Sequence, residues 1–152
     1  MSTINQQYLR ECFYYLNGKL IWKRRPRSHF NSDRGWNSFN TNYAYREAGC
    51  VFRRSGRPER FTIGINGKRY LRHRLIWIFH NGDIPDDLII DHINGDTLND
   101  QIENLRLVTL EINANNSKQR KDNRSGVTGV DMTPHVNRHV PVQARFSELG
   151  SR

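Results

Sequence analysis

Apolar positions in the first half of the chain predict two β-hairpins. The first lies over residues 13–23, where two aromatic-rich runs flank an Asn-Gly pair at 17–18, the dipeptide most typical of a two-residue hairpin turn. The second lies over 60–71, where apolar side chains alternate and another Asn-Gly pair at 66–67 supplies the turn. Glycine and asparagine interrupt residues 24–50 throughout, which predicts a long irregular surface loop.

The spacing of apolar residues changes in the second half to a helix followed by strand, loop, strand and helix. Residues 71–80 are apolar at helical spacing and end at an Asn-Gly pair, which predicts a short helix. The apolar run at 88–90 predicts a buried strand, and the alternating residues 104–108 predict a second one. Thr109 is a suitable N-cap for a helix over roughly 110–117.

The last part of the chain is polar and basic. After residue 117 no apolar period is visible, which predicts a linker. Residues 127–146 predict one more hairpin, in which Pro134 and Pro141 confine the strands to a sheet edge or to loops. Together these patterns predict an α+β fold, with a hairpin-rich N-terminal part packed on a strand-strand-helix core and an extended C-terminal tail.

Composition indicates a folded chain in water. Hydrophobic residues make up 36% of it, and its 7 Phe, 6 Tyr and 3 Trp are more than a solvated basic tail would carry. No apolar run approaches the roughly 18 residues of a membrane span, and the N-terminus lacks the profile of a signal peptide. We expect Cys12 and Cys50 to be buried, reduced thiols, because they lie far apart and form no Cys-x-x-Cys pair, which excludes a zinc ribbon.

Charge is distributed unevenly along the chain. Residues 1–80 carry 16 Lys and Arg against 4 acids, residues 118–152 carry 7 against 3, and the segment between them carries 1 against 8. The basic parts favour a polyanion such as nucleic acid, because each neutralised phosphate releases counterions. An acidic segment would repel phosphates unless a divalent metal intervenes. Loop-shaping or solvated carboxylates are the alternative for most of this segment, Asp100 among them.

Four side chains of the acidic segment form the predicted site: Asp91, His92, Asn104 and Asn113. If the two strands pair and the helix packs across them, Asp91 and His92 emerge at a strand end and Asn113 returns to meet them. A carboxylate with an amide oxygen is an oxygen-only ligand pair that suits Mg²⁺ or Mn²⁺. The neighbouring imidazole is then available as a base. Taken alone, His92 would be interpreted as a surface histidine after a strand.

The stretch IDHINGDTLNDQIENLRLVTLEINANN resembles the HNH nuclease motif in its His-Asn-Asn form, as found in phage HNH homing endonucleases. The resemblance covers residues 88–117, and GKRYLRHRLIW before it is similar to the N-terminal portion of the same proteins. It implies a ββα-metal core in which His92 is the general base, Asp91 and Asn113 hold one Mg²⁺ or Mn²⁺ ion, and Asn104 ties the loop together. The cysteine pairs of HNH proteins with structural zinc are lacking, so no zinc is implied.

The resemblance also implies an activity. HNH nucleases of this kind hydrolyse one phosphodiester bond in double-stranded DNA and leave 3′-hydroxyl and 5′-phosphate ends. With one base, one metal pair and no heptad pattern, we expect a monomer that nicks one strand. A DNA-binding regulator on an HNH scaffold that no longer cuts is the alternative, and the complete motif favours cutting. A phage-encoded protein of this kind would act in the cytoplasm of the bacterial host.

The tail begins with RSGVTGV, which resembles the opening of the AP2-type DNA-binding domains appended to phage HNH nucleases. The tryptophan of the second strand is absent, which indicates a degenerate or truncated module. We therefore predict three parts: a β-rich DNA-binding portion at 1–85 with a short helix at 71–80, the HNH motif at 86–117, and a basic linker with a partial AP2-like hairpin at 118–152.

Most of the basic residues are clustered, and as a set we predict that they contact DNA phosphates. Solvated surface charge is the alternative for any one of them. We assign no chemistry to His73 or His80, because histidines on a mainly apolar helix are more often satisfied parts of the core. The four clusters are Lys23, Arg24, Arg25 and Arg27; Arg53, Arg54, Arg57 and Arg60; Lys68, Arg69, Arg72 and Arg74; and Lys118, Arg120, Lys121 and Arg124.

Overall fold

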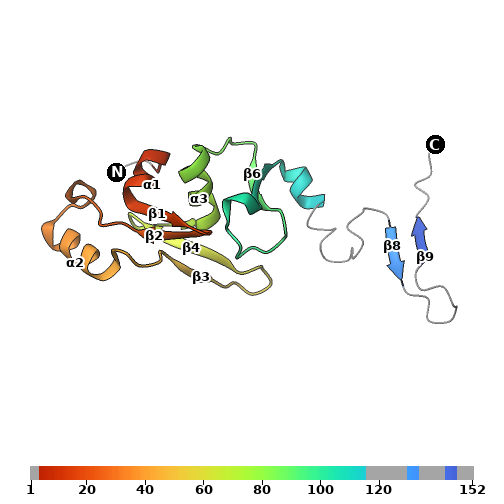
Figure 1. Cartoon of the computed structure of the whole chain (residues 1–152), viewed down its shortest axis with the longest axis horizontal. Coiled ribbons are helices and arrows are strands. Elements are labelled where there is room, and N and C mark those ends of the chain that lie inside the picture. Colours follow the sequence, from red (N-terminus) through yellow and green to blue (C-terminus); the bar gives the residue numbers. More distant parts are fainter. Residues whose placement is uncertain (1–3, 116–129, 134–142, 147–152) are drawn as a thin grey trace. The chain divides into compact units, whose positions relative to one another are not determined.

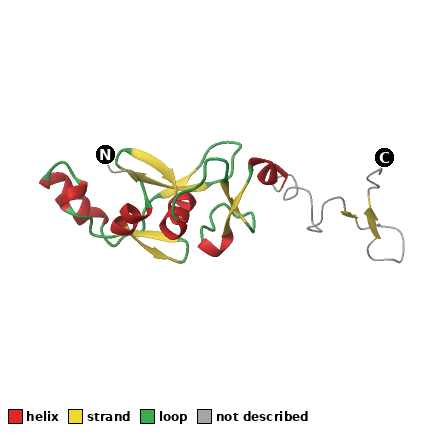
Figure 2. Cartoon of the chain, turned by 90° about the horizontal axis from the view of Figure 1, so that it is seen from above, coloured by secondary structure: helices red, strands yellow, loops and turns green. Residues whose placement is uncertain are grey.

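The computed structural model describes residues 4–115 and two strands of the tail, at 130–133 and 143–146 (Figure 1). The chain divides into two compact units, residues 1–108 and 109–152. Short helices and strands are mixed along the first unit, and its strands form small separate sheets (Figure 2). The predicted α+β class is confirmed.

The elements of the first unit follow one another closely, and every strand pair in it is antiparallel. The sheets are β1-β2, β3-β4-β5 and β6-β7. In chain order the elements are α1 (Gln6–Cys12), β1 (Phe13–Leu16), β2 (Lys19–Trp22), the 3-10 turn η1 (Arg27–His29), α2 (Asp33–Tyr43), β3 (Cys50–Phe52), β4 (Arg60–Ile65), β5 (Lys68–Leu71), α3 (Arg72–Asn81), β6 (Ile89–His92), the 3-10 turn η2 (Ile102–Asn104) and β7 (Leu105–Val108).

Both hairpins predicted from Asn-Gly pairs are present. Asn17 and Gly18 join β1 to β2 with φ angles of 45° and 80°. Asn66 and Gly67 join β4 to β5 with φ angles of 51° and 75°. Two successive left-handed residues match the right-handed twist of the flanking strands, and Asn and Gly adopt that conformation at low cost.

The loop predicted over 24–50 is wrong, because its middle forms α2. Ser32 caps this helix by accepting a hydrogen bond from the amide of Gly35 at 3.1 Å. The aromatic residues at 36, 39 and 43 share one helical face. Phe39 packs edge-on against Trp22, with 4.9 Å between ring centroids. Tertiary packing of aromatic side chains therefore outweighs the low helix propensity of the intervening asparagines and glycine.

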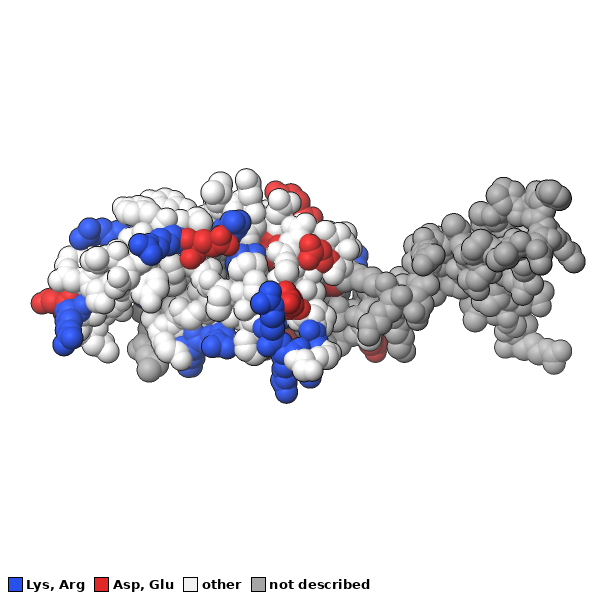
Figure 3. All heavy atoms as spheres, turned by 90° about the horizontal axis from the view of Figure 1, so that it is seen from below, with Lys and Arg blue, Asp and Glu red and all other residues white. Residues whose placement is uncertain are grey.

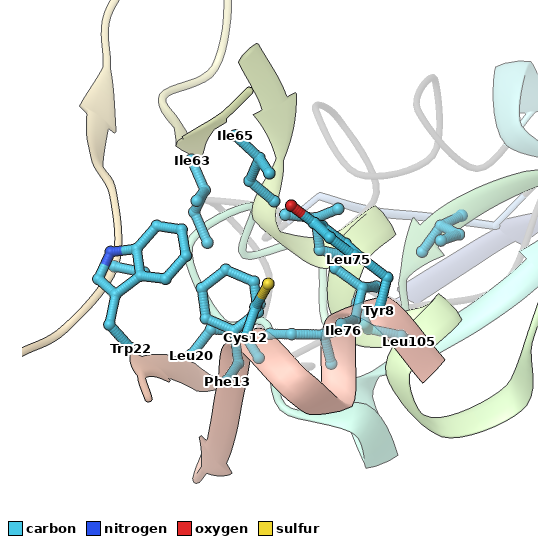
Figure 4. Packing of buried hydrophobic residues seen from close by; sticks show 13 residues of the cluster. Tyr8, Cys12, Phe13, Leu20, Trp22, Ile63, Ile65, Leu75, Ile76 and Leu105 are labelled. Atoms are coloured by element: carbon cyan, nitrogen blue, oxygen red, sulfur yellow. The ribbon is translucent and has the colours of Figure 1, made fainter. Parts of the chain in front are cut away.

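A single hydrophobic core connects the helices of the first unit to its hairpins (Figure 4). Helix α1, which the sequence did not predict, begins at the N-cap Asn5 and packs on α3. Ile90 and Leu105 bring β6 and β7 into the same core. The core residues labelled in the figure are Tyr8, Cys12, Phe13, Leu20, Trp22, Ile63, Ile65, Leu75, Ile76 and Leu105. The β6-β7 hairpin, which carries the predicted site, is thus anchored to the N-terminal part of the chain.

The two cysteines occupy different environments. Cys12 is buried, and burial raises the pKa of its thiol to about 11. Cys50 is exposed at the edge strand β3, so the prediction that both thiols are buried is wrong for Cys50. Both are free thiols, as predicted.

The second unit contains the helical segment 110–115 and the paired strands β8 (Val130–Thr133) and β9 (Gln143–Phe146). Thr109 accepts a hydrogen bond from the amide of Ile112 at 3.4 Å, so it caps the helical segment as predicted. The pairing of β8 with β9 confirms a hairpin in the tail, whereas most of the predicted linker lies outside the described residues. None of the described helices is long and apolar enough to cross a membrane.

Candidate active site

Strand β6 ends in the two central residues of the predicted motif. Its register with β7 pairs Asp91 with Arg106 and His92 with Leu105. Since successive side chains of a strand point to opposite faces, Asp91 shares a face with Arg106 and His92 shares a face with Leu105. Both motif side chains are only 4% exposed. The strand therefore presents a buried carboxylate on one face and a buried imidazole on the other.

Asp91 is paired with a cation across the hairpin. Nη2 and Nε of Arg106 donate to the same carboxylate oxygen, Oδ2, at 2.9 and 3.2 Å. The Asp91 side chain is 4% exposed, whereas that of Arg106 is 41% exposed. A buried carboxylate is stable only with such a partner, and the exposed guanidinium leaves the pair accessible at the surface of the hairpin.

His92 is bound by a residue that sequence reasoning had set aside. Its Nε2 lies 2.8 Å from Oδ1 of Asp100. Asp100 was expected to be a loop-shaping or solvated carboxylate; because it is 2% exposed, the solvated alternative is wrong. It follows a loop that leaves β6 and returns to the body of the unit.

Arg72 binds the other oxygen of Asp100. Its Nε donates to Oδ2 at 2.7 Å, and its Nη1 donates to Glu47 at 3.1 Å. The guanidinium lies 3.5 Å from the ring centroid of Phe61 and is 3% exposed. His92, Asp100, Arg72 and Glu47 thus form a continuous chain of hydrogen-bonded side chains, which we call the buried ion chain.

His73 lies beside this chain. Its ring meets that of His92 edge to face, with 5.0 Å between centroids. The pKa of His73 is lowered to about 3, chiefly by burial; Asp100 opposes this shift, and His92, Arg60 and Arg74 add to it. His73 is therefore a neutral imidazole at physiological pH.

Asn104 fastens the loop that follows His92. Its Oδ1 accepts from the amide of Asn94 at 3.0 Å, and its Nδ2 donates to the carbonyl of Asn99 at 2.8 Å. Its own carbonyl accepts from the amide of Ile93 at 2.8 Å. These bonds join both ends of the loop to one side chain, which supports the structural role inferred from the sequence.

The fourth motif residue belongs to the second unit. Asn113 lies on the helical segment 110–115, where its amide donates to the carbonyl of Thr109 at 3.0 Å. Its role as a metal ligand stays a prediction.

Among the described residues, two places near the end of β6 have donor atoms suited to a metal ion: Asp91 on its own, and a second group of three side chains. Asp91 offers carboxylate oxygen, which suits a hard cation such as Mg²⁺. His73, His92 and Asp100 each offer one donor atom within 4.8 Å of the others. An arginine neutralises each carboxylate, Arg106 at Asp91 and Arg72 at Asp100. The Arg106 side chain is 41% exposed and can turn toward solvent, whereas that of Arg72 is 3% exposed and would repel a second cation beside Asp100. The donor chemistry therefore fits a hard divalent ion at Asp91 better than an ion at the second group.

The predicted DNA-contacting residues divide by exposure. Arg25 and Arg72 are buried, at 4% and 3% exposure, so they are corrected from phosphate contacts to interior residues. Arg25 donates to the hydroxyl of Tyr8 at 2.6 Å within a surround of aromatic rings. The cations of the tail cluster lie outside the described residues. Those that stay exposed among the described residues are Arg24, Arg27, Arg53, Arg54, Arg57, Lys68, Arg69 and Arg74.

Exposed cations surround one hollow in the surface. A pocket of about 600 Å³ is lined by Phe52, Arg54, Arg57, Pro58, Arg60 and Leu71. Figure 3 shows that Lys and Arg side chains gather in several groups over the face it displays, with acidic groups between them. We call the loop at 53–59, between β3 and β4, the arginine arm.

Comparison with known proteins identifies the central part of the chain. Residues 70–115 match the family model described as HNH endonuclease. The resemblance to HNH endonucleases is confirmed. We call residues 70–115 the HNH segment; it contains Arg72, His73 and Asp100 as well as the four motif residues.

Two viral proteins resemble the chain. Protein 3.8 of Escherichia phage T7 is 46% identical over 59 residues, which cover 39% of this chain and 49% of that protein. An uncharacterized HNH endonuclease, L560, of Acanthamoeba polyphaga mimivirus is 36% identical over 75 residues, which cover 49% of this chain and 37% of that protein. The chain therefore spans about half or less of the length of these relatives.

A solved structure is also similar. It concerns DNA binding and cleavage by the HNH homing endonuclease I-HmuI, with a TM-score of 0.47 and 20% sequence identity. The similarity covers 79% of this chain and 59% of that one.

Sequence reasoning missed Arg72, His73 and Asp100. One signal was available for Arg72: it precedes the buried Leu75 and Ile76 by three and four residues, so it lies on the buried stripe of α3. A charge on such a stripe needs a buried partner. The sequence does not say which of the eight acids of the central segment that partner is.

Proposed function

We propose that the protein is a metal-dependent DNA endonuclease that nicks one strand of double-stranded DNA. The observation that carries this proposal is the end of β6, where a buried imidazole and a buried carboxylate stand next to each other in the HNH segment. Neither side chain has a reason to be buried for stability alone, since apolar residues at both positions would cost less.

The two faces of β6 suit two different tasks in this reaction. His92 takes the proton from the attacking water. Asp91 and Asn113 are the residues that would hold a Mg²⁺ or Mn²⁺ ion, and such an ion stabilises the charge that grows on the phosphate and the leaving oxygen. A phosphodiester lying across the end of β6 meets His92 on one side and Asp91 on the other. Attack opposite the 3′ oxygen leaves a 3′-hydroxyl and a 5′-phosphate.

DNA affinity comes from the exposed cations. The arginine arm and the pocket beside it offer guanidinium groups to successive phosphates. A monomer with one His92 acts on one strand, since the target phosphate of the other strand lies across a groove. The cytoplasm of a bacterial host is the compartment in which such a protein would meet its DNA.

The test is cleavage of supercoiled plasmids that carry random DNA inserts. With Mg²⁺ or Mn²⁺ we expect open-circle DNA to accumulate before any linear form, and a chelator to stop it. His92→Ala should lower the rate by roughly 10²- to 10⁴-fold with DNA affinity preserved. His80→Ala is the matched control, because His80 lies on α3 and has no assigned role.

Three outcomes would contradict the proposal. Cleavage that persists in chelator would show that the reaction needs no metal ion. Cleavage that survives His92→Ala would show that His92 is not the base. Tight DNA binding without cleavage under every metal condition would favour the regulator instead. Linear product that appears at once, at a rate rising with the square of protein concentration, would indicate a dimer rather than a nicking monomer.

A further inference from the structure

We propose that Asp100 is a positioning residue for His92: it holds the imidazole in the tautomer that carries its proton on Nε2 and leaves Nδ1 to accept the proton of water. This inference rests on the proposed function, which makes His92 the base. It adds a residue outside the His-Asn-Asn motif to the machinery of the site.

The first argument is the chemistry of the pair. Nε2 of His92 and Oδ1 of Asp100 are 2.8 Å apart, and both side chains are buried. An ionised carboxylate accepts hydrogen bonds and cannot donate them, so the proton between these atoms belongs to Nε2. A neutral imidazole with its proton on Nε2 has its lone pair on Nδ1. The position of Asp100 therefore selects which nitrogen of His92 can act as a base.

The second argument is that Arg72 keeps Asp100 an acceptor. The guanidinium donates to Oδ2 at 2.7 Å, so the two carboxylate oxygens bind different partners. Arg72 is held in turn by Glu47 at 3.1 Å, and its guanidinium carbon lies 3.5 Å from the ring centroid of Phe61. Because arginine has no acceptor, a carboxyl proton on Oδ2 has no place to go. The carboxylate of Asp100 is thus fixed in rotation, with one oxygen directed at each partner.

The third argument is that the backbone at Asp100 is fixed from outside the HNH segment. The β1-β2 turn packs so closely that a Cβ on Gly18 would lie 2.8 Å from the amide nitrogen of Gln101 and 3.1 Å from the carbonyl carbon of Asp100. The hydroxyl of Tyr15 accepts from the amide of Ile102 at 3.0 Å. Such support is what a group that must hold another side chain in register requires.

The substitution Asp100→Asn turns this geometry into a test. An asparagine has one oxygen and one NH₂ group, and the donor Arg72 demands the oxygen. The NH₂ group then faces Nε2 of His92 and donates to it, which forces the imidazole proton onto Nδ1. The shape of the site is kept while the basic nitrogen is lost. In a serine protease the analogous aspartate-to-asparagine change lowers kcat by about 10⁴ through the wrong tautomer.

The experiment has a spectroscopic readout and a kinetic one. The full chain, labelled with ¹⁵N-histidine, is compared by NMR at about pH 8 as wild type, Asp100→Asn and the matched control Asp87→Asn. Asp87 is exposed and lies outside the site. Its substitution therefore makes the same change from carboxylate to amide at a position away from His92. His92 signals are assigned by their loss in His92→Gln. Plasmid nicking at saturating DNA, DNA affinity and thermal unfolding are measured on the same samples.

We expect wild type and Asp87→Asn to show the His92 proton on Nε2, and Asp100→Asn to show it on Nδ1. The nicking rate at saturating DNA should fall by roughly 10²- to 10⁴-fold in Asp100→Asn, with KM for DNA and the affinity for DNA unchanged. The double variant Arg72→Met with Asp100→Asn frees the amide to turn its oxygen to His92. It should restore the Nε2 proton and part of the rate.

Each failure has a distinct meaning. A wild-type His92 with its proton on Nδ1 overturns the inference, even if every Asp100 variant fails to fold. An unchanged tautomer and rate in Asp100→Asn overturns it as well. If wild type does not cut DNA but the tautomer shifts as expected, the proposed endonuclease function fails and the positioning role of Asp100 stands.

Discussion

Two groups of arginines in this protein have the same sequence appearance and opposite surroundings. Arg25 and Arg72 come from basic clusters, yet both are buried and hydrogen-bonded to polar side chains, Arg25 among several aromatic rings and Arg72 against the ring of Phe61. Arg54 and Arg57 of the arginine arm come from a similar cluster and are exposed around Gly56, whose left-handed conformation (φ 72°) turns the arm in open space. A cluster of basic residues in a sequence can therefore contain both buried and exposed side chains.

The difference lies in the hydration that a charged group loses when it is buried. An exposed guanidinium keeps its water and is available to a phosphate, whereas a buried one loses water and is stable only with fixed partners. The buried arginines hold the interior together, and the exposed ones are those that we propose contact DNA. Three predictions test how charged groups of the interior differ from those of the surface.

The largest effect is expected on stability in the interior. Arg72→Ala removes the cation that pairs with Asp100 and with one carboxylate oxygen of Glu47. Breaking a buried ion pair in this way costs about 3–5 kcal/mol of stability. Arg57→Ala in the arginine arm should change the free energy of unfolding by less than about 0.5 kcal/mol. Urea unfolding of both variants measures the contrast, and equal losses would remove the distinction between the two groups.

The second prediction concerns the dependence of stability on pH. The pKa of His73 is lowered to about 3, so between that pH and about 6.5 the unfolded chain binds a proton that the folded one does not. Stability therefore falls as the pH drops below about 6.5, by up to roughly 1.4 kcal/mol per pH unit.

The groups that act on His73 are Asp100, His92, Arg60 and Arg74, and the first of these opposes the shift. His73→Leu should flatten the acid limb of the unfolding curve measured from about pH 7 to pH 4. A limb that stays equally steep in this variant would assign the acid sensitivity to other groups.

The smallest effect is expected at the surface. Arg54→Ala and Arg57→Ala should each lower the slope of log affinity for DNA against log salt by about 0.9, the value of one phosphate contact, with thermal unfolding unchanged. Fluorescence anisotropy over a series of salt concentrations measures the slope. An unaltered slope in both variants would show that the arginine arm does not touch the backbone of DNA.

Local signals made most of the elements predictable. The two Asn-Gly turns, the apolar period of α3, the apolar run of β6 and the alternation in β7 each act within a few residues, and each was correctly located. Helix α2 was missed because its stability comes from contacts with residues far away in the sequence. Asn40, for example, is buried where its side chain accepts from the amide of Arg25 at 2.8 Å.

The same contrast holds for the site. His92 and Asn104 belong to a short motif, and their positions around one loop follow from the strand pairing. The buried ion chain depends on four segments that meet only in the folded protein, with Glu47 and Arg72 far from the motif in sequence. Sequence spacing does not predict these contacts, because they depend on how α3 packs against β4 and the hairpins.

The close approach of the Gly18 turn to the backbone of Asp100 also bears on when activity can arise. A chain cut between the hairpin and the HNH segment keeps every residue of the motif but has nothing to press the 100–101 backbone into place. Contacts between distant segments form late in folding. The cleavage proposed above is therefore expected only from a chain that holds both segments and has completed its fold.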